Sequence, residues 1–210
     1  LSIDLETTSL STLDAEIVGV AVAWNPNEAA YIPVGHTYTG VPDQLSQEQV
    51  FEILRPLLED ENLPKIGQNL KYEWQVLRRA AQVVMRGVSC DTMLAAYLLE
   101  PGRRVSLDIL SEDELGHRMI SFAEATAGQG EDAGFAAVPV EQATEYAGED
   151  ADDAPLLKHI CPPGVKPGQW FLVEDNDGEA ECSAPDDVEL TTEYTLTLTC
   201  TQSTEVFGSM

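Results

Sequence analysis

Short apolar runs alternate with amphipathic stretches along the first 160 residues of the chain. Runs rich in β-branched residues predict strands at residues 1–5, 16–24, 29–34 and 64–68. Three strands that follow one another, and then strands that alternate with helices, predict an α/β fold with a mixed sheet. No apolar run approaches the roughly 18 residues that a membrane-spanning helix needs.

The amphipathic stretches have the period of an α-helix, with apolar residues three or four positions apart. They predict helices over residues 46–58, 70–81, 92–99, 105–115, 122–125 and 140–153. Ser46 and Asp91 precede two of these helices and are expected to cap them, because their side-chain oxygens accept hydrogen bonds from free backbone N–H groups. Pro155 is expected to end or kink the last helix.

The pattern changes after residue 160. Residues 161–210 have no helical period, are rich in Thr, Pro and Gly, and hold 10 Asp and Glu against one basic residue, Lys166. Three β-prone segments, at residues 169–174, 178–183 and 188–200, predict a small β-meander. We therefore expect a domain over residues 1–160 and an acidic β-rich tail over residues 161–210. The tail is either a foreign extension or a module that binds a protein partner.

The charge is strongly negative, with 11 Lys and Arg against 37 Asp and Glu and a net charge of −26. Proteins that bind nucleic acid through its phosphates are usually basic, so composition alone argues against such a partner unless some of the acids hold cations. No signal peptide is visible, and we expect a cytoplasmic protein. The chain begins with Leu inside a predicted strand, so we expect a fragment of a longer protein.

The cysteines, tryptophans and histidines are expected to have structural roles. The four cysteines lack zinc-site spacing; Cys90 is expected to be a buried apolar residue, and the other three are free to pair. The tryptophans are expected to anchor the core: Trp24, Trp74 and Trp170. The histidines are expected in loops or on the surface: His36, His117 and His159.

Four acidic residues and a tyrosine carry the candidate chemistry. Asp4 and Glu6 are two apart on a strand and so project from one face, where two like charges are unfavourable without a cation. Glu73 lies one turn into a predicted helix, and Tyr146 and Asp150 share a helical face at i, i+4 spacing. Oxygen-rich clusters of this kind suit Mg²⁺ or Mn²⁺. For Asp4 and Glu6 alone, two solvated acids at a strand end are the alternative.

Three motifs within these segments, IDLETT, GQNLKYE and YAGEDAD, resemble in order the motifs of the 3′→5′ proofreading exonuclease domain of bacterial DNA polymerase I. The amino-acid sequence between the motifs is similar as well, and the resemblance covers residues 1–160. That domain belongs to the tyrosine subclass of the DEDD superfamily and has a ribonuclease H-like fold. The resemblance therefore implies an exonuclease that uses two divalent ions on the 3′ end of single-stranded DNA, with a polymerase domain attached in the natural protein.

The resemblance also implies roles for individual residues. The implied ligands of the two ions, Mg²⁺ or Mn²⁺, are Asp4, Glu6, Glu73 and Asp150, and the implied water-orienting residue is Tyr146. The implied contacts to the terminal nucleotides are Leu5, Gln68, Asn69, Tyr72 and Phe122. Arg103 and Arg104 precede residue 105 in a loop; Arg104 is a candidate phosphate contact, and a solvated basic loop is the alternative.

Glu73 departs from the family, which has an aspartate at this position. The charge is kept, but the carboxylate lies one methylene further from the backbone, and Mg²⁺ tolerates little change in geometry. Two interpretations follow. Either the chain is a 3′→5′ exonuclease whose activity Glu73 weakens, or it is a scaffold or protein-binding module that keeps the exonuclease fold without the activity.

Overall fold

The computed structural model describes residues 1–127 and 134–161 and two short strands at residues 172–174 and 180–182. A five-stranded sheet has the order β3-β2-β1-β4-β5. Its strands are β1 (Ser2–Thr7), β2 (Ile17–Asn25), β3 (Glu28–Pro33), β4 (Lys65–Gly67) and β5 (Val88–Asp91). β1, β2 and β3 pair antiparallel, whereas β4 and β5 run parallel to β1. The predicted mixed sheet is therefore confirmed.

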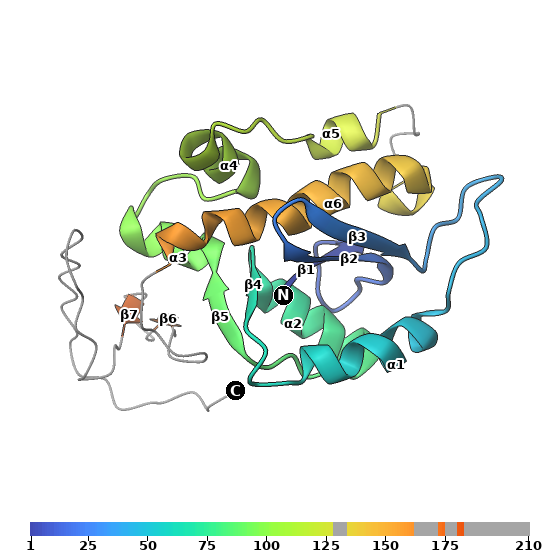
Figure 1. The fold of residues 1–210 in the computed structure, drawn as a ribbon, viewed down its shortest axis with the longest axis horizontal. Helices are drawn as coiled ribbons and strands as arrows, with labels where there is room; N and C mark the ends of the chain where they lie inside the picture. The colour runs from blue at the N-terminus through green and yellow to red at the C-terminus, as the bar shows by residue number, and fades with distance from the viewer. Residues whose placement is uncertain (128–133, 162–171, 175–179, 183–210) are drawn as a thin grey trace.

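Helices cover both faces of this sheet (Figure 1). The helices are α1 (Gln47–Leu58), α2 (Leu70–Val76), α3 (Thr92–Leu99), α4 (Leu107–Leu115), α5 (Phe122–Ala125) and α6 (Val140–Leu156). Shorter helical turns are the π-helix η1 (Leu77–Ala81) and the 3₁₀ turns η2 (Phe135–Ala137) and η3 (Leu157–Ile160). Among the described residues, none of these helices is long and apolar enough to cross a membrane.

The two faces of the sheet are packed differently. On one face, α1, α2 and η1 contribute large aliphatic residues, among them Leu54, Leu58 and Leu77, which pack on Ile3 and Leu5 of β1. On the other face, α6 presents a stripe of alanines to β2 and β3, namely Ala143, Ala147 and Ala151. Small side chains let a helix backbone approach a sheet closely, so α6 lies near the residues of β1 that point to this face.

The predicted caps are present. Ser46 and Gln49 form a reciprocal capping box at the start of α1. The Asp91 carboxylate accepts a hydrogen bond from the Leu94 backbone N–H of α3, at 3.1 Å, and a second from the Asn69 N–H, at 3.2 Å. Asn69 precedes α2 and has a left-handed backbone, with φ of 56°. One carboxylate therefore holds the starts of α2 and α3 and ties them to the end of β5.

Several local predictions differ from the structure. β5 is a strand that the pattern did not predict, because four residues are too few to show a period. The helix predicted over residues 70–81 changes to a π-helical turn at Leu77. The prediction at Pro155 fits the structure, because α6 ends at Leu156, one residue after the proline.

Three side-chain predictions are also wrong. Cys90 is buried, but it is bonded to Cys161 in a disulfide, with the Cα atoms 6.1 Å apart. Trp24 is 54% exposed, because the end of β2 extends beyond the helices that cover the sheet. His36 is buried at 3% exposure, because the chain after β3 turns inward toward the start of α6. Trp74 does pack against the aliphatic core.

The tail is described only in part. β6 (Leu172–Glu174) and β7 (Ala180–Cys182) pair antiparallel, within two of the segments predicted to be strands. The third predicted strand, residues 188–200, Trp170 and Cys200 lie outside the described residues. The division of the chain after residue 160 stays a prediction.

Candidate active site

β1 supplies the first two acids of the site. Asp4 and Glu6 point to the α6 face, while Ile3 and Leu5 between and beside them point into the aliphatic core. On the neighbouring strand, Asp4 pairs with Ala21 and Glu6 pairs with Gly19. The small residues of β2 leave room beside both carboxylates, so neither acid is covered by a bulky neighbour from that strand.

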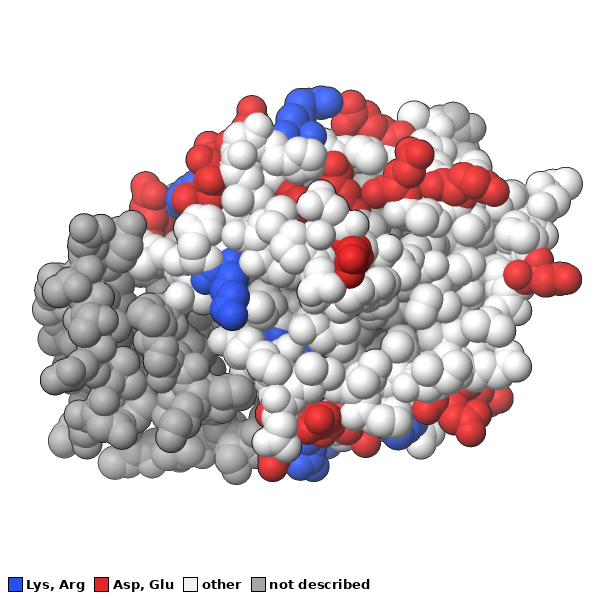
Figure 2. All heavy atoms as spheres, in the orientation of Figure 1, with Lys and Arg blue, Asp and Glu red and all other residues white. Residues whose placement is uncertain are grey.

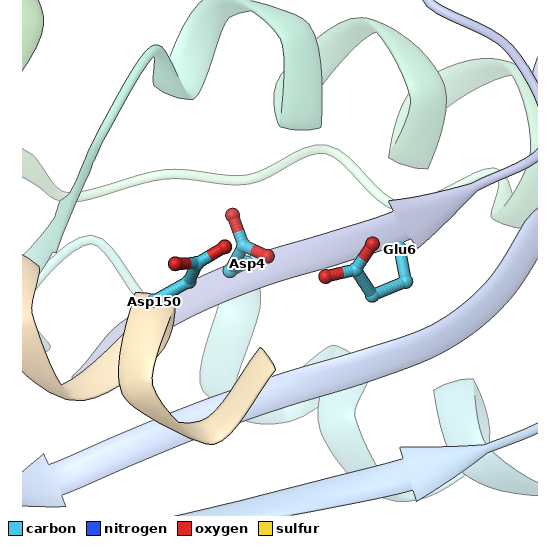
Figure 3. A group of neighbouring side chains, drawn as sticks. All are labelled: Asp4, Glu6 and Asp150. Atoms are coloured by element: carbon cyan, nitrogen blue, oxygen red, sulfur yellow. The ribbon is translucent and has the colours of Figure 1, made fainter. Parts of the chain in front are cut away.

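α6 supplies the third acid. Carboxylate oxygens of Asp4, Glu6 and Asp150 lie within 4.8 Å of one another, although Asp150 is far from the other two in sequence. Figure 3 shows the Asp150 side chain extending from α6 toward Asp4 on β1, with the Glu6 carboxylate directed back toward both. The alanine stripe of α6 makes this approach feasible, because Ala147 and Ala151 flank Asp150 and are fully buried against the sheet.

The three carboxylates are electrostatically strained. Burial raises the pKa of Asp4 from 3.8 to about 6. Burial, and then the neighbouring charges of Asp4 and Asp150, raise the pKa of Glu6 well above its usual range. Burial and the Asp4 charge do the same to the pKa of Asp150. Among the described residues, no side-chain or backbone donor forms a hydrogen bond to the Asp4 or Glu6 carboxylate, so a cation is the natural way to stabilise their charged forms.

Glu73 lies close to this group but outside it. It is 4% exposed, its Oε2 atom has no hydrogen-bond partner, and burial, followed by the charge of Asp4, raises its pKa well above the usual range. A buried carboxylate oxygen without a donor is unfavourable unless a proton or a cation reaches it. The structure thus gathers three of the four predicted acids and leaves the fourth with a free oxygen beside Asp4.

Aromatic side chains lie beside the acids. Tyr146 is one turn before Asp150, and its hydroxyl interacts with the Asp150 carboxylate. The Phe135 ring packs against both Tyr146 and Phe122, with centroids 5.7 Å and 6.2 Å away. Phe122 remains 54% exposed, so one of its surfaces is free for a planar group. Tyr146 therefore lies on the face of α6 that bears Asp150, and Phe122 lies against Tyr146, with ring centroids 6.4 Å apart. The roles of water-orienting residue and base contact stay predictions.

The other predicted contact residues are less free. Leu5 is 6% exposed and belongs to the aliphatic core, so its side chain does not support the predicted role. The Gln68 amide donates to the Val105 carbonyl and accepts from Thr92. The Tyr72 hydroxyl donates to the Ser9 carbonyl and lies 2.5 Å from the Thr7 hydroxyl. These polar groups position the loops around the site.

Two predicted residues keep free groups. The Asn69 side chain makes no hydrogen bond within the described part of the chain, although Asn69 begins α2. Arg104 is exposed and forms no ion pair with described residues, whereas the adjacent Arg103 pairs with Asp113 and Glu114. Arg103 is therefore held by ion pairs and is not simply solvated. For Arg104, both a phosphate contact and a solvated basic residue stay as interpretations.

Two exposed leucines on the loop that follows β1, Leu10 and Leu13, were not predicted as functional residues. Leu10 is 94% exposed, on the loop that follows the acid-bearing strand β1. The same loop is fixed by Tyr72, and by Arg79, which donates to the Thr12 and Ala15 carbonyls. The sequence does contain a signal for this feature, because an apolar residue stands in a polar loop directly after a strand with two acids.

The donor set fits a hard divalent cation. All its atoms are carboxylate oxygens, joined by the unpartnered Oε2 of Glu73, and no soft sulfur or imidazole ligand is among them. Mg²⁺ and Mn²⁺ prefer such oxygens. Asp4, Glu6 and Asp150 are therefore the residues that would hold an ion, with Glu73 at the edge of the cluster.

Comparison with known proteins identifies the family of the chain. The family model for 3′-5′ exonucleases, of the DNA polymerase A type, matches residues 1–160. The chain belongs to this exonuclease family. DNA polymerase I of Pseudomonas aeruginosa is 42% identical over 154 residues, which are 72% of the chain and 17% of the polymerase. DNA polymerase I of Synechocystis is 37% identical over an alignment of 198 positions, which covers 85% of the chain and 20% of the polymerase.

Solved structures share the fold of this exonuclease domain. Brucella melitensis NrnC bound to pGG has a TM-score of 0.55 and 23% identity, over 76% of the chain and 70% of that protein. The Pol1 structure from M. smegmatis with a DNA primer-template has a TM-score of 0.52 and 23% identity, over 75% of the chain and 23% of that protein. The predicted ribonuclease H-like architecture is thus confirmed. The domain spans only about a fifth of the polymerases that it matches.

Proposed function

We propose that the chain removes nucleotides one at a time from the 3′ end of single-stranded DNA. The observation that supports this most directly is the convergence of Asp4, Glu6 and Asp150 within 4.8 Å, next to Tyr146. Two divalent ions, Mg²⁺ or Mn²⁺, would supply charge stabilisation for the attacking and leaving oxygens of the phosphodiester. We also infer that the exonuclease domain works beside a polymerase domain in the natural protein, since its relatives are DNA polymerases I.

The protein's own groups have distinct roles in this reaction. Tyr146 orients the attacking water, because it lies one turn before Asp150 on the same face of α6. The water oxygen forms the new bond to phosphorus, the bond from phosphorus to the 3′ oxygen breaks, and a nucleoside 5′-monophosphate leaves. The water proton passes to solvent, and the new 3′ end gains a proton as a hydroxyl group. Burial keeps the pKa of the Tyr146 hydroxyl above its usual range, so it stays protonated and able to donate.

The substrate would be held mainly by stacking and by a few polar contacts. The exposed ring of Phe122 can stack on the last base, and the exposed Leu10 can contact its neighbour. The free amide of Asn69 and the guanidinium of Arg104 are available to the sugar and phosphate. Few cations line the surface in Figure 2, where acidic side chains gather along the edge formed by α4, α5 and α6. Bound metal ions would therefore supply the positive field that the surface lacks.

A scaffold without activity is the second candidate. Glu73 favours it, because its longer side chain stands where the family has aspartate and its Oε2 atom lacks a partner. In that case the acidic tail, with a protein partner, would carry the function.

The test is a time course on single-stranded DNA labelled at its 5′ end, with Mn²⁺ and with excess EDTA. We expect a ladder of products that shorten from the 3′ end and that needs the metal. A blocked 3′ end should abolish the ladder, and Asp4→Asn should do the same without unfolding the chain. A chain that binds Mn²⁺ with no cleavage would favour the scaffold, and a chain that binds none would contradict the assigned site.

A further inference from the structure

The start of α6 depends on a distant segment of the chain. The N-cap of α6 is Pro139, which offers no side-chain cap. Instead, the Val140 backbone N–H donates to the Tyr38 hydroxyl at 3.1 Å. The Thr37 N–H donates to the Ala136 carbonyl at 2.8 Å. The helix that carries Tyr146 and Asp150 is therefore capped and aligned by residues that precede it by about a hundred positions.

His36 adds the buried part of this connection. Its Nδ1 atom lies 2.9 Å from the Val138 carbonyl oxygen, and its Nε2 atom lies 2.7 Å from the Tyr31 hydroxyl. A carbonyl oxygen only accepts, so Nδ1 must carry the proton. In the neutral ring Nε2 then accepts, and Tyr31 must donate to it. Burial lowers the pKa of His36, which favours this neutral form.

Tyr31 links His36 to the row of sheet residues that contains Asp4. Asp4, Ala21 and Tyr31 pair across β1, β2 and β3 and lie in one row on the α6 face. The Tyr31 ring leans from this row over Gly19, the residue that pairs with Glu6. A Cβ at Gly19 would collide with the Tyr31 hydroxyl, so the ring can lie here only because residue 19 is glycine.

His36 also contacts the aromatic side of the site. Its ring is 6.1 Å from Phe135, which packs on Tyr146 and Phe122. The Tyr31 and Tyr38 rings meet it edge-on, at 5.8 Å and 6.2 Å. A continuous set of contacts thus runs from the row of Asp4 on the sheet, through Tyr31 and His36, to the start of α6 and the aromatic residues of the site.

We propose that Tyr31 and His36 are positioning residues of the exonuclease site, which set the distance between Asp150 on α6 and the Asp4–Glu6 pair on β1. This inference rests on the proposed function, because it assigns the pair to the same metal-binding acids. Neither residue has to touch substrate or metal. They act by fixing one helix on one face of the sheet.

Tyr31→Phe is the sharpest test, because it removes one hydroxyl and leaves the ring over Gly19. Residues that orient metal ligands typically contribute about 10–100-fold to metal affinity. We expect Mn²⁺ affinity, measured by calorimetry and by electron paramagnetic resonance, to fall by about tenfold or more, with a similar fall in kcat and little change in KM for DNA. His36→Phe, which loses both hydrogen bonds, should have a larger effect than Tyr31→Phe.

Val50→Ala on α1 is the matched control. It lies in the aliphatic core on the opposite face and should lower the thermal midpoint while leaving Mn²⁺ affinity unchanged. Equal losses of thermal stability in Tyr31→Phe and Val50→Ala, with unchanged Mn²⁺ affinity in both, would show a purely structural role and overturn the proposal. If the wild-type chain binds Mn²⁺ in that experiment, the result would overturn only the role of Tyr31 and His36, and the proposed function would be unaffected.

The His36 ring offers a readout that needs no metal. We expect ¹⁵N nuclear magnetic resonance of the metal-free chain to show Nδ1 protonated and Nε2 unprotonated. The opposite tautomer would contradict the connection from Tyr31 to Val138, whatever the activity. A wild-type chain that binds no Mn²⁺ would overturn the proposed function and, with it, the role of this pair.

Discussion

The two faces of the sheet use opposite means to hold their helices. Beneath α1 and α2, large aliphatic residues such as Leu58 and Leu77 fill the space and are fully buried. Beneath α6, the contacts are alanines, and polar residues from β1 and β3 share the same surface. Burial of apolar area contributes about 25 cal/mol per Å², so the aliphatic face contributes more stability for each residue buried.

The difference shows what each face is built to hold. On the α6 face, small side chains bring a helix backbone near β1, where three acids with raised pKa values, Asp4, Glu6 and Asp150, have few hydrogen-bond donors. Glu73 of α2, whose pKa is also raised, lies close to them. Such an arrangement destabilises the metal-free chain. The aliphatic face must offset this, and substitutions on the two faces should therefore separate stability from activity.

Asp4→Asn should have the largest effect on activity. Charge stabilisation by a bound metal is worth several kcal/mol, so loss of a ligand should lower hydrolysis by about a thousandfold. The same change removes a buried like charge, so the thermal midpoint in EDTA should rise. Glu16→Gln, at an exposed acid, is the control and should change neither quantity. A lower midpoint in Asp4→Asn would contradict the strain assigned to the acid cluster.

Leu58→Ala should have the opposite profile. The residue is fully buried in the aliphatic face, and truncation at such sites costs about 2–5 kcal/mol of unfolding free energy. We expect denaturant melts to shift by this amount, while kcat measured on the folded chain stays within about twofold of the wild type. Ala147→Val on α6 is the counterpart: it should destabilise by about 1–3 kcal/mol and lower kcat, because it lifts Asp150 from the sheet. If Leu58→Ala and Ala147→Val lowered kcat equally, the proposed difference between the two faces would be wrong.

Glu73→Asp tests the departure from the family at the edge of the α6 face. If the longer side chain limits the site, the shorter one should raise hydrolysis of single-stranded DNA by about 10–100-fold. Glu73→Gln keeps the length and removes the charge, and it should lower the rate. An unchanged rate in Glu73→Asp would mean that the surrounding chain already accommodates glutamate.

The pH dependence of stability should be the smallest of these effects. A carboxyl whose folded pKa is raised binds more protons folded than unfolded, so stability is lost as pH rises through the interval between the two values. For Asp4 this interval runs from 3.8 to about 6. In EDTA, the free energy of unfolding from urea melts should fall across this interval, and Asp4→Asn should flatten the slope. Added Mn²⁺ should restore stability above pH 6, and a slope unaffected by metal would argue against binding at these acids.

The sequence predicted much of this arrangement because its signals were local. Ser46 and Asp91 marked helix starts, and the i, i+2 and i, i+4 spacings put Asp4 with Glu6 and Tyr146 with Asp150 on common faces. Joining β1 to α6 required the family resemblance, since no period along the chain relates residues so far apart.

The errors share one physical cause. His36 looked like a loop residue because its partners, Tyr31 and Val138, come from two other segments. Cys90 looked unpaired because Cys161 is 71 residues away. Each depended on contacts that form only when the whole domain closes.

The contacts that Tyr38 and His36 make at the start of α6 have a consequence for the order in which the chain folds. The hydrogen bond from His36 to Val138 joins residues 102 positions apart, so its loop-closure entropy is large and it forms late. The β1–β2–β3 meander needs only neighbouring segments and can form first. We therefore expect the repelling acids of β1 and α6 to meet only after most of the chain has folded, when the aliphatic face is already in place to hold them together.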